Sequence, residues 1–169
     1  TTPFLEETGQ YIPIPDSEIA KRLIGAIDDS SPVWHGDDET WSLGGNQGKF
    51  ALARIDNQWM RCEGSYPSTH ILKPGVSGMP LQALVEFATM QTADHVGLRV
   101  SKTSYREFDG VGAIIIERYD RMHADDAIVR IHQEDFCQAL GYLPANKYDV
   151  VTSDALALIK AFADTKSMN

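Results

Sequence analysis

The sequence contains one glycine-rich stretch, Ser42-Leu43-Gly44-Gly45-Asn46-Gln47-Gly48-Lys49, between two segments typical of β-strands. Glycine has no Cβ, so the backbone N–H groups of such a turn can approach the oxygens of a phosphate group closely. A plain β-turn is the alternative, because short glycine patterns also arise by accident. The stretch is not a Walker A loop, since that motif needs glycine where Leu43 stands and Ser or Thr where Phe50 stands.

Downstream of this turn the sequence predicts strands, then a helix, then two more strands. Residues 49–55 and 58–62 are predicted strands joined by the hairpin turn Asp56-Asn57. A third strand, 68–73, ends at Pro74-Gly75. Residues 81–96 then have the periodicity of a helix that ends at Gly97. Five apolar residues of this helix can share one face: Leu81, Leu84, Val85, Ala88 and Val96.

The remaining segments complete an α+β prediction. Residues 98–103 and 111–117 are predicted strands, and the apolar run 113–116 is typical of an interior strand that is buried on both faces. Residues 1–15 contain three prolines and are an extended lead-in, followed by an amphipathic helix at 18–27. After Asp120 we expect helices at 133–140 and 153–165. We predict three parts: a lead-in with a short helix (1–39), an antiparallel sheet with one main helix (40–120), and a helical part (121–169).

Composition excludes several classes of function. The 169 residues carry a formal net charge of −9, so phosphate repels the chain at long range and autonomous DNA binding is not expected. The histidines have no metal-ligand spacing, and Cys62 and Cys137 form no C-x-x-C pair, so we predict reduced thiols and no metal site. There is no run of eighteen apolar residues, so we predict no membrane span, and the two reduced thiols predict a cytoplasmic protein. The first residue is not Met, and we expect the chain to be a segment of a longer protein.

Two charged residues stand where a nucleotide site would need them. Lys73 ends a predicted strand, and Glu86 lies on the following helix, thirteen positions later (86 − 73). In protein kinases a glycine-rich loop, a strand lysine and a helix glutamate occur in this order; the lysine holds phosphates and the glutamate holds the lysine. Taken singly, each residue is more commonly a solvated surface charge. The three elements in order favour a nucleotide site.

The segment Glu117-Arg118-Tyr119-Asp120-Arg121 follows the most apolar predicted strand. In kinases the segment that leaves the last strand of the small lobe is the hinge, and its backbone binds adenine. A charged strand exit without a ligand is an equal alternative on the residues alone.

Four segments resemble HipA-like kinases, the toxin component of bacterial HipBA-type toxin–antitoxin modules. They are Ser42–Lys49, Pro67-Ser-Thr-His-Ile-Leu-Lys73, Ile116-Glu-Arg-Tyr-Asp-Arg121 and His132-Gln-Glu-Asp-Phe-Cys-Gln-Ala-Leu140. The resemblance implies a protein-kinase-like small lobe, followed by the first helices of a large lobe, with ATP as the cofactor.

The resemblance also implies roles for individual residues. Residues 44–49 would lie over the ATP phosphates, Lys73 would contact the α and β phosphates, and Glu86 would pair with Lys73. The hinge 117–119 would bind adenine through the backbone of Glu117 and Tyr119. Ser42 would be a site of autophosphorylation that inactivates the kinase. Gln133-Glu134-Asp135 would cap and pack the next helix.

The chain contains no residue to which the resemblance assigns the transfer step or a catalytic metal. Those aspartates are expected beyond Asn169, and neither Phe108-Asp109-Gly110 nor Asp135-Phe136-Cys137 is expected to bind Mg²⁺. The parent would phosphorylate Ser or Thr of a cellular protein such as an aminoacyl-tRNA synthetase. It would pair with a HipB-like helix-turn-helix antitoxin and reach DNA only through it. The alternative is a stand-alone, non-catalytic module that contacts an antitoxin or a kinase partner.

Overall fold

The computed structural model describes residues 9–28, 47–124, 127–143 and 152–166 of the chain. Ser42, Gly44, Gly45 and Asn46 lie outside the described residues. The chain divides into two compact units, residues 1–130 and 131–169.

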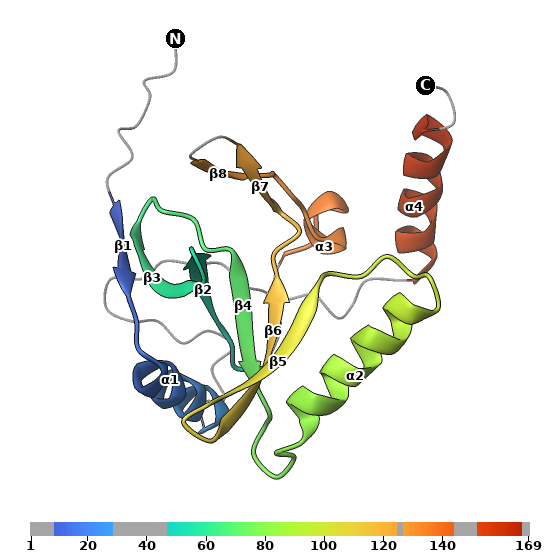
Figure 1. Cartoon of the computed structure of the whole chain (residues 1–169). Coiled ribbons are helices and arrows are strands. Elements are labelled where there is room, and N and C mark those ends of the chain that lie inside the picture. Colours follow the sequence, from blue (N-terminus) through green and yellow to red (C-terminus); the bar gives the residue numbers. More distant parts are fainter. Residues whose placement is uncertain (1–8, 29–46, 125–126, 144–151, 167–169) are drawn as a thin grey trace. The chain divides into compact units, whose positions relative to one another are not determined.

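The first unit is built on a six-stranded antiparallel sheet with the strand order β1-β3-β2-β4-β6-β5 (Figure 1). The strands are β1 (Gly9–Pro13), β2 (Phe50–Ile55), β3 (Gln58–Gly64), β4 (His70–Pro74), β5 (Thr103–Phe108) and β6 (Val111–Glu117). The unit also holds two helices, α1 (Asp16–Asp28) and α2 (Gln82–His95), and a hairpin of β7 (Arg121–Ala124) and β8 (Ala127–Arg130). The second unit contains α3 (Phe136–Ala139) and α4 (Thr152–Lys166). The predicted α+β class with a large antiparallel sheet is confirmed.

Two tight turns set the sheet connections. Asp56 and Asn57 have φ angles of 48° and 65°, and Asp109 and Gly110 have 44° and 82°. Two successive left-handed residues form the turn whose twist matches that of the flanking strands, and Asn, Asp and Gly adopt this conformation at the lowest cost. The hairpin predicted at Asp56-Asn57 is confirmed.

The two helices cover opposite faces of the sheet. Leu72 and Lys73 are neighbours on β4, so their side chains point to opposite faces. Leu72 is fully buried in the apolar cluster that includes Ile19 and Leu23 of α1, whereas Lys73 contacts Glu86 of α2. We call these the α1 face and the α2 face. The segment expected as a lead-in therefore supplies both an edge strand, β1, and a helix that closes the core.

The apolar residues that share one face of α2 are largely exposed. Leu81, Val85 and Val96 are 65%, 61% and 67% exposed, and Ala83 is the residue of this helix that is buried. The reason is the contact of Glu86 with Lys73: a helix that turns Glu86 towards the sheet also turns Ala83 inward, three positions earlier. Periodicity shows which residues share a face, and it does not show what covers that face.

The end of α2 also moves the next strand. Gly97 (φ 85°) donates its N–H to Asp94 and Leu98 donates to Ala93, which are the two bonds of a Schellman cap. The C-terminal role predicted for Gly97 is confirmed. The strand predicted at 98–103 is wrong, because this cap uses Leu98, and β5 begins only at Thr103.

Two further differences follow Asp120. Residues 121–124 and 127–130, which the sequence placed in a helical part, form the antiparallel strands β7 and β8 instead. The helix predicted from residue 133 begins at Phe136, because Asp135 caps it. The Asp135 carboxylate accepts from the Gln138 N–H at 2.9 Å, and the Gln138 side chain accepts from the Asp135 N–H at 2.8 Å. A capping role for this segment is confirmed at Asp135.

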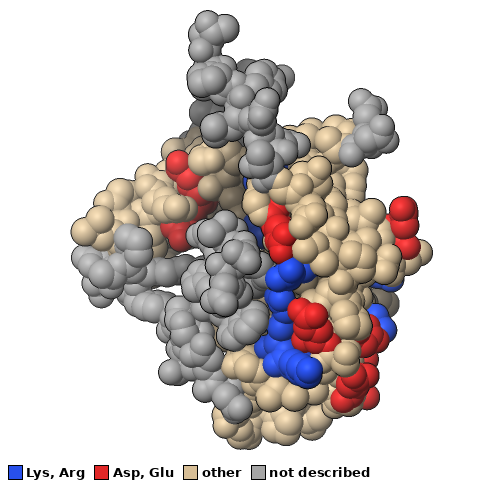
Figure 2. Space-filling model, turned by 90° about the vertical axis from the view of Figure 1, so that its left-hand side faces the viewer, with Lys and Arg blue, Asp and Glu red and all other residues tan. Residues whose placement is uncertain are grey.

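The charged surface is mixed where it can be seen. Figure 2 shows basic and acidic side chains side by side on one face of the molecule, rather than a continuous basic surface of the kind that binds nucleic acid. Arg61 and Glu63 form one of the ion pairs of this unit, at 2.7 Å. Among the described residues, no helix has the length and apolar character needed to cross a membrane.

We expect Leu72→Ala to lower the free energy of unfolding by about 2–5 kcal/mol, because Leu72 is fully buried at the centre of the α1 face. Leu84→Ala removes the same atoms from the 40% exposed side of α2 and should cost well under half as much. Urea denaturation of both variants measures the difference. Equal losses would mean that α2 buries the face that carries Leu84.

Candidate functional site

The side chains of Lys73 and Glu86 meet on the α2 face. The Lys73 Nζ lies 2.6 Å from Oε1 and 2.8 Å from Oε2 of Glu86, so the ammonium group is held by both carboxylate oxygens. The two side chains are 17% and 29% exposed, which leaves the pair accessible from solvent. A charge fixed in this way can receive an anionic group without first having to be positioned.

The described end of the glycine-rich stretch is bonded to β4 at the residue after Lys73. The Gln47 amide donates to the carbonyl oxygen of Pro74, the residue after Lys73, at 2.8 Å. Lys49 is buried and donates its Nζ to the Gln47 carbonyl at 2.9 Å. Gly48 has a packing role, because a Cβ at this position would overlap the carbonyl group of Ala26 in α1. The stretch therefore ends anchored both to β4 and to α1.

An apolar strip continues from Lys73 along the same face. Ile71 lies two residues before Lys73 on β4, and its partner on β6 is Ile116. Both are half-buried, and the small side chain of Ala51, opposite Ile71 on β2, is buried. The strip thus offers a partly open apolar surface next to a fixed cation, a combination that suits a flat aromatic base attached to phosphates.

The strip ends at the segment predicted as a hinge. His70 of β4 is the register partner of Glu117, so the hinge begins three residues along β4 from Lys73, about 10 Å away. Glu117 donates its N–H to the Lys102 carbonyl, and Arg118 donates to the Thr69 carbonyl, each at 2.9 Å. Tyr119 is 74% exposed.

A buried charge cluster lies directly under the hinge. The side chains of Arg118, Asp120 and Arg121 are each at most 8% exposed. Burial acts to raise the pKa of Asp120, but the hydrogen bonds and charges of Arg118 and Arg121 outweigh it and hold the pKa below its ordinary value of 3.8. The sequence grouped Arg118 with the nucleotide contacts; the structure turns its side chain into this cluster. No role was predicted for Asp120 and Arg121, although alternating charges after an apolar strand were the available signal.

His70 is a second titratable group near the hinge, on the α1 face. Burial is the main cause that lowers its pKa below the ordinary value of 6.5; Glu117 opposes the shift, and Arg54 and His123 add to it. The His70 Nδ1 lies 2.7 Å from the Thr69 hydroxyl, and the ring meets Trp59 edge-on at 5.3 Å between centroids.

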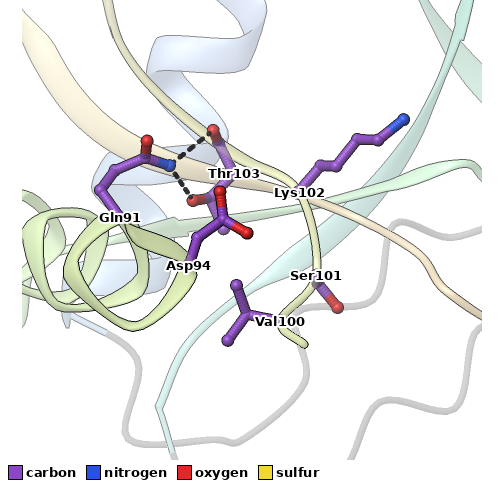
Figure 3. A pocket seen from close by; sticks show the side chains of 6 residues that line it. All are labelled: Gln91, Asp94, Val100, Ser101, Lys102 and Thr103. Atoms are coloured by element: carbon purple, nitrogen blue, oxygen red, sulfur yellow. Dashed lines mark hydrogen bonds between the residues drawn. The ribbon is translucent and has the colours of Figure 1, made fainter. Parts of the chain in front are cut away.

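A separate hollow of about 270 Å³ lies between the second half of α2 and the segment that leads into β5 (Figure 3). The Gln91 amide donates to the Thr103 hydroxyl at 3.1 Å across one side of it, while Lys102 points away from Gln91 and Asp94. None of its lining residues was predicted as a site residue. In the described part of the chain, no group of three or more His, Cys, Asp and Glu side chains could hold a metal ion.

Comparisons with known proteins point to one family. Residues 41–169 match the model of the HipA-like C-terminal domain. The putative kinase Y4mE of Sinorhizobium fredii is 42% identical over 108 residues, which cover 63% of this chain and 26% of that protein. The serine/threonine-protein kinase toxin HipA of Shewanella oneidensis is 31% identical over 147 residues, 86% of this chain and 33% of that protein.

A solved complex of the HipA and HipB toxin–antitoxin system of Shewanella oneidensis MR-1 with its operator DNA contains a similar chain. The TM-score is 0.66 at 28% identity, covering 87% of this chain and 34% of the other. The antiparallel sheet and the strand lysine paired with a helix glutamate have the arrangement of a protein-kinase small lobe. The chain belongs to the HipA-like C-terminal domain family. It spans between a quarter and a third of the length of these relatives.

We expect Asp120→Asn to lower the free energy of unfolding by about 3–5 kcal/mol at neutral pH, because two buried guanidinium groups lose their counter-charge. Because the pKa of Asp120 is lower in the folded chain, its ionised carboxylate stabilises the fold above pH 3.8. This stabilisation disappears as the pH falls through the pKa of Asp120 in the folded state. The variant should therefore lose less stability than the parent below about pH 4. Asp16→Asn, at a half-exposed ion pair with Arg106, is the control and should cost under about 1 kcal/mol.

His70 makes the fold sensitive to mild acid. The pKa of His70 is lower in the folded chain, so as the pH falls below 6.5 the imidazole of the unfolded chain is protonated before that of the folded chain. The free energy of unfolding therefore decreases in this range. His70→Gln should flatten this decrease in denaturation curves recorded between pH 7.5 and 5. His132→Gln, at an 85% exposed side chain, should leave it in place. A His70→Gln curve parallel to that of the parent would argue against the assignment.

Proposed function

We propose that this chain is the ATP-binding part of a HipA-type serine/threonine protein kinase. The observation that carries the proposal is the Lys73–Glu86 pair, which lies on the same sheet face as the strip of Ile71 and Ile116. A cation at one end of an apolar strip and a hinge at the other fit the phosphates and the base of one nucleotide.

Each part of the site has a defined task in this proposal. Lys73, held by Glu86, binds the α and β phosphates, and residues 44–49 lie over them. Adenine packs against the apolar strip. The N–H groups of Glu117 and Arg118 bond within the sheet, so the Glu117 carbonyl and the Tyr119 N–H are the groups that meet the adenine edge. Residues 40–120 are the nucleotide-binding lobe, and residues 121–169 begin the second lobe.

The rest of the kinase activity is proposed for the whole protein. Its relatives are about three to four times as long as the part matched here, and we propose that the catalytic and Mg²⁺-binding aspartates lie in their remaining length. The substrate would be a Ser or Thr of a cytoplasmic protein such as an aminoacyl-tRNA synthetase. The HipA–HipB–DNA complex supports a HipB-like partner that carries the DNA contact. A phosphate on Ser42 would repel the ATP phosphates and switch the site off.

Calorimetry with Mg-ATP tests this function on the 169-residue chain. We expect weak binding without turnover, and a loss of about tenfold or more in affinity for Lys73→Met, because a charge-assisted contact to phosphate disappears. Lys102→Met is the matched control. It removes the same charge from a side chain that is 85% exposed, and the Lys102 Nζ lies 3.9 Å from the Glu117 carboxylate, farther than Lys73 lies from Glu86. Equal affinities of the two variants would remove the basis of the proposal. Tight, Mg²⁺-dependent binding with turnover would place the transfer chemistry within this chain.

One observation favours a second candidate, a non-catalytic module that contacts an antitoxin or a kinase partner. The apolar side chains of Leu81, Leu84 and Val85 are exposed along the outer side of α2, and such surfaces are used in protein contacts. The same titration separates the two candidates, because a pure binding module takes up no ATP at the Lys73 site.

A further inference from the structure

We propose that Ser68, Arg118, Asp120 and Arg121 form a hinge clamp, which fixes the hinge backbone against β4 and thereby sets the adenine half of the site. This inference rests on the proposed ATP-binding function. It assigns a positioning role to residues that do not touch the nucleotide, and it distinguishes the adenine end of the site from the phosphate end at Lys73.

The centre of the clamp is the Asp120 carboxylate. Arg118 donates to it through Nε at 3.0 Å and Nη2 at 2.8 Å, which is a bidentate pairing. Arg121 donates through Nη1 to the same carboxylate at 2.7 Å and to the Asp120 carbonyl at 2.8 Å. These four bonds hold residues 118–121 in one conformation.

Three further bonds join this segment to the start of β4. The Arg118 Nη1 donates to the Ser68 hydroxyl at 3.2 Å, and the Arg121 Nε donates to the Ser68 carbonyl at 2.8 Å. The Arg118 N–H donates to the Thr69 carbonyl at 2.9 Å. Thr69 in turn bonds to β2, through its N–H to the Leu52 carbonyl and through its hydroxyl to the Arg54 N–H. The hinge is therefore attached to a segment that is itself fixed in the sheet.

The geometry suits positioning. The side chains of Arg118 and Asp120 are buried, while Tyr119 between them is 74% exposed. The clamp therefore holds the residues on either side of the proposed adenine contact, and Tyr119 itself stays accessible. Replacing a buried ion cluster by apolar packing of equal volume is often neutral or stabilising, so we assign this cluster the role of fixing one arrangement of the hinge backbone. Because Ser68 leads directly into β4, the clamp also holds the hinge in the same frame as Lys73.

Ser68→Ala tests the clamp with the smallest change, since it removes one hydroxyl and leaves all charges in place. Ser104→Ala, on the exposed part of β5, is the matched control. Two measurements are made on the full 169-residue chain. The first is hydrogen exchange of the backbone amides of residues 117–121. The second is calorimetry with ATP and, separately, with inorganic tripolyphosphate, which has the phosphates without the base.

In Ser68→Ala we expect hinge amides to exchange about tenfold faster and ATP to bind about five- to tenfold more weakly, as expected when a hydrogen bond to a charged group is lost. Tripolyphosphate affinity should change less than twofold, and the control should match the parent in both measurements.

The possible failures are distinguishable. Unchanged hinge exchange, or an equal loss of ATP and tripolyphosphate affinity, overturns the clamp and leaves the proposed ATP site standing. If the parent chain binds neither ligand, the proposed function fails, and the role of the clamp in adenine recognition fails with it.

Discussion

The salt bridge between Lys73 and Glu86 joins the two elements that the rest of the first unit depends on. It requires β4 to present Lys73 on the α2 face, and therefore to present Leu72 to the core on the other face. It also sets the rotation of α2 about its axis, since the glutamate has to point at the sheet. The helix that closes the core is α1, which is why α2 can leave apolar side chains exposed.

Much of this arrangement could be predicted from local sequence. The turn at Asp56-Asn57 has backbone preferences that few other residue pairs share, and the apolar run of β6 has the length and character of an interior strand. The order of the glycine-rich stretch, the strand lysine and the helix glutamate favoured a nucleotide site, and the family resemblance implied the Lys73–Glu86 contact. These are features that a few neighbouring residues, or a few residues in a known order, can indicate.

Features that depend on distant partners could not be predicted in the same way. The sequence does not show that α2 turns Ala83 inward, because the contact of Glu86 with a residue of β4 decides it. The role of Gly48 depends on the backbone of Ala26 in another element. The bonds of Arg118 and Arg121 to Ser68 cross about fifty residues of chain. The family resemblance marked both segments without showing that they bind each other.

The contacts at Ser68 and Thr69 have a consequence for how the sheet assembles. They lie at one end of the β4–β6 ladder, where the pairing of His70 with Glu117 begins. A slip of one residue along this ladder would keep most backbone hydrogen bonds, but it would exchange the positions of Leu72 and Lys73 and place an ammonium group in the apolar core. The hinge clamp therefore fixes the register of β4 against β6. A chain that has paired these strands wrongly cannot form the clamp, so a formed site requires correct strand alignment.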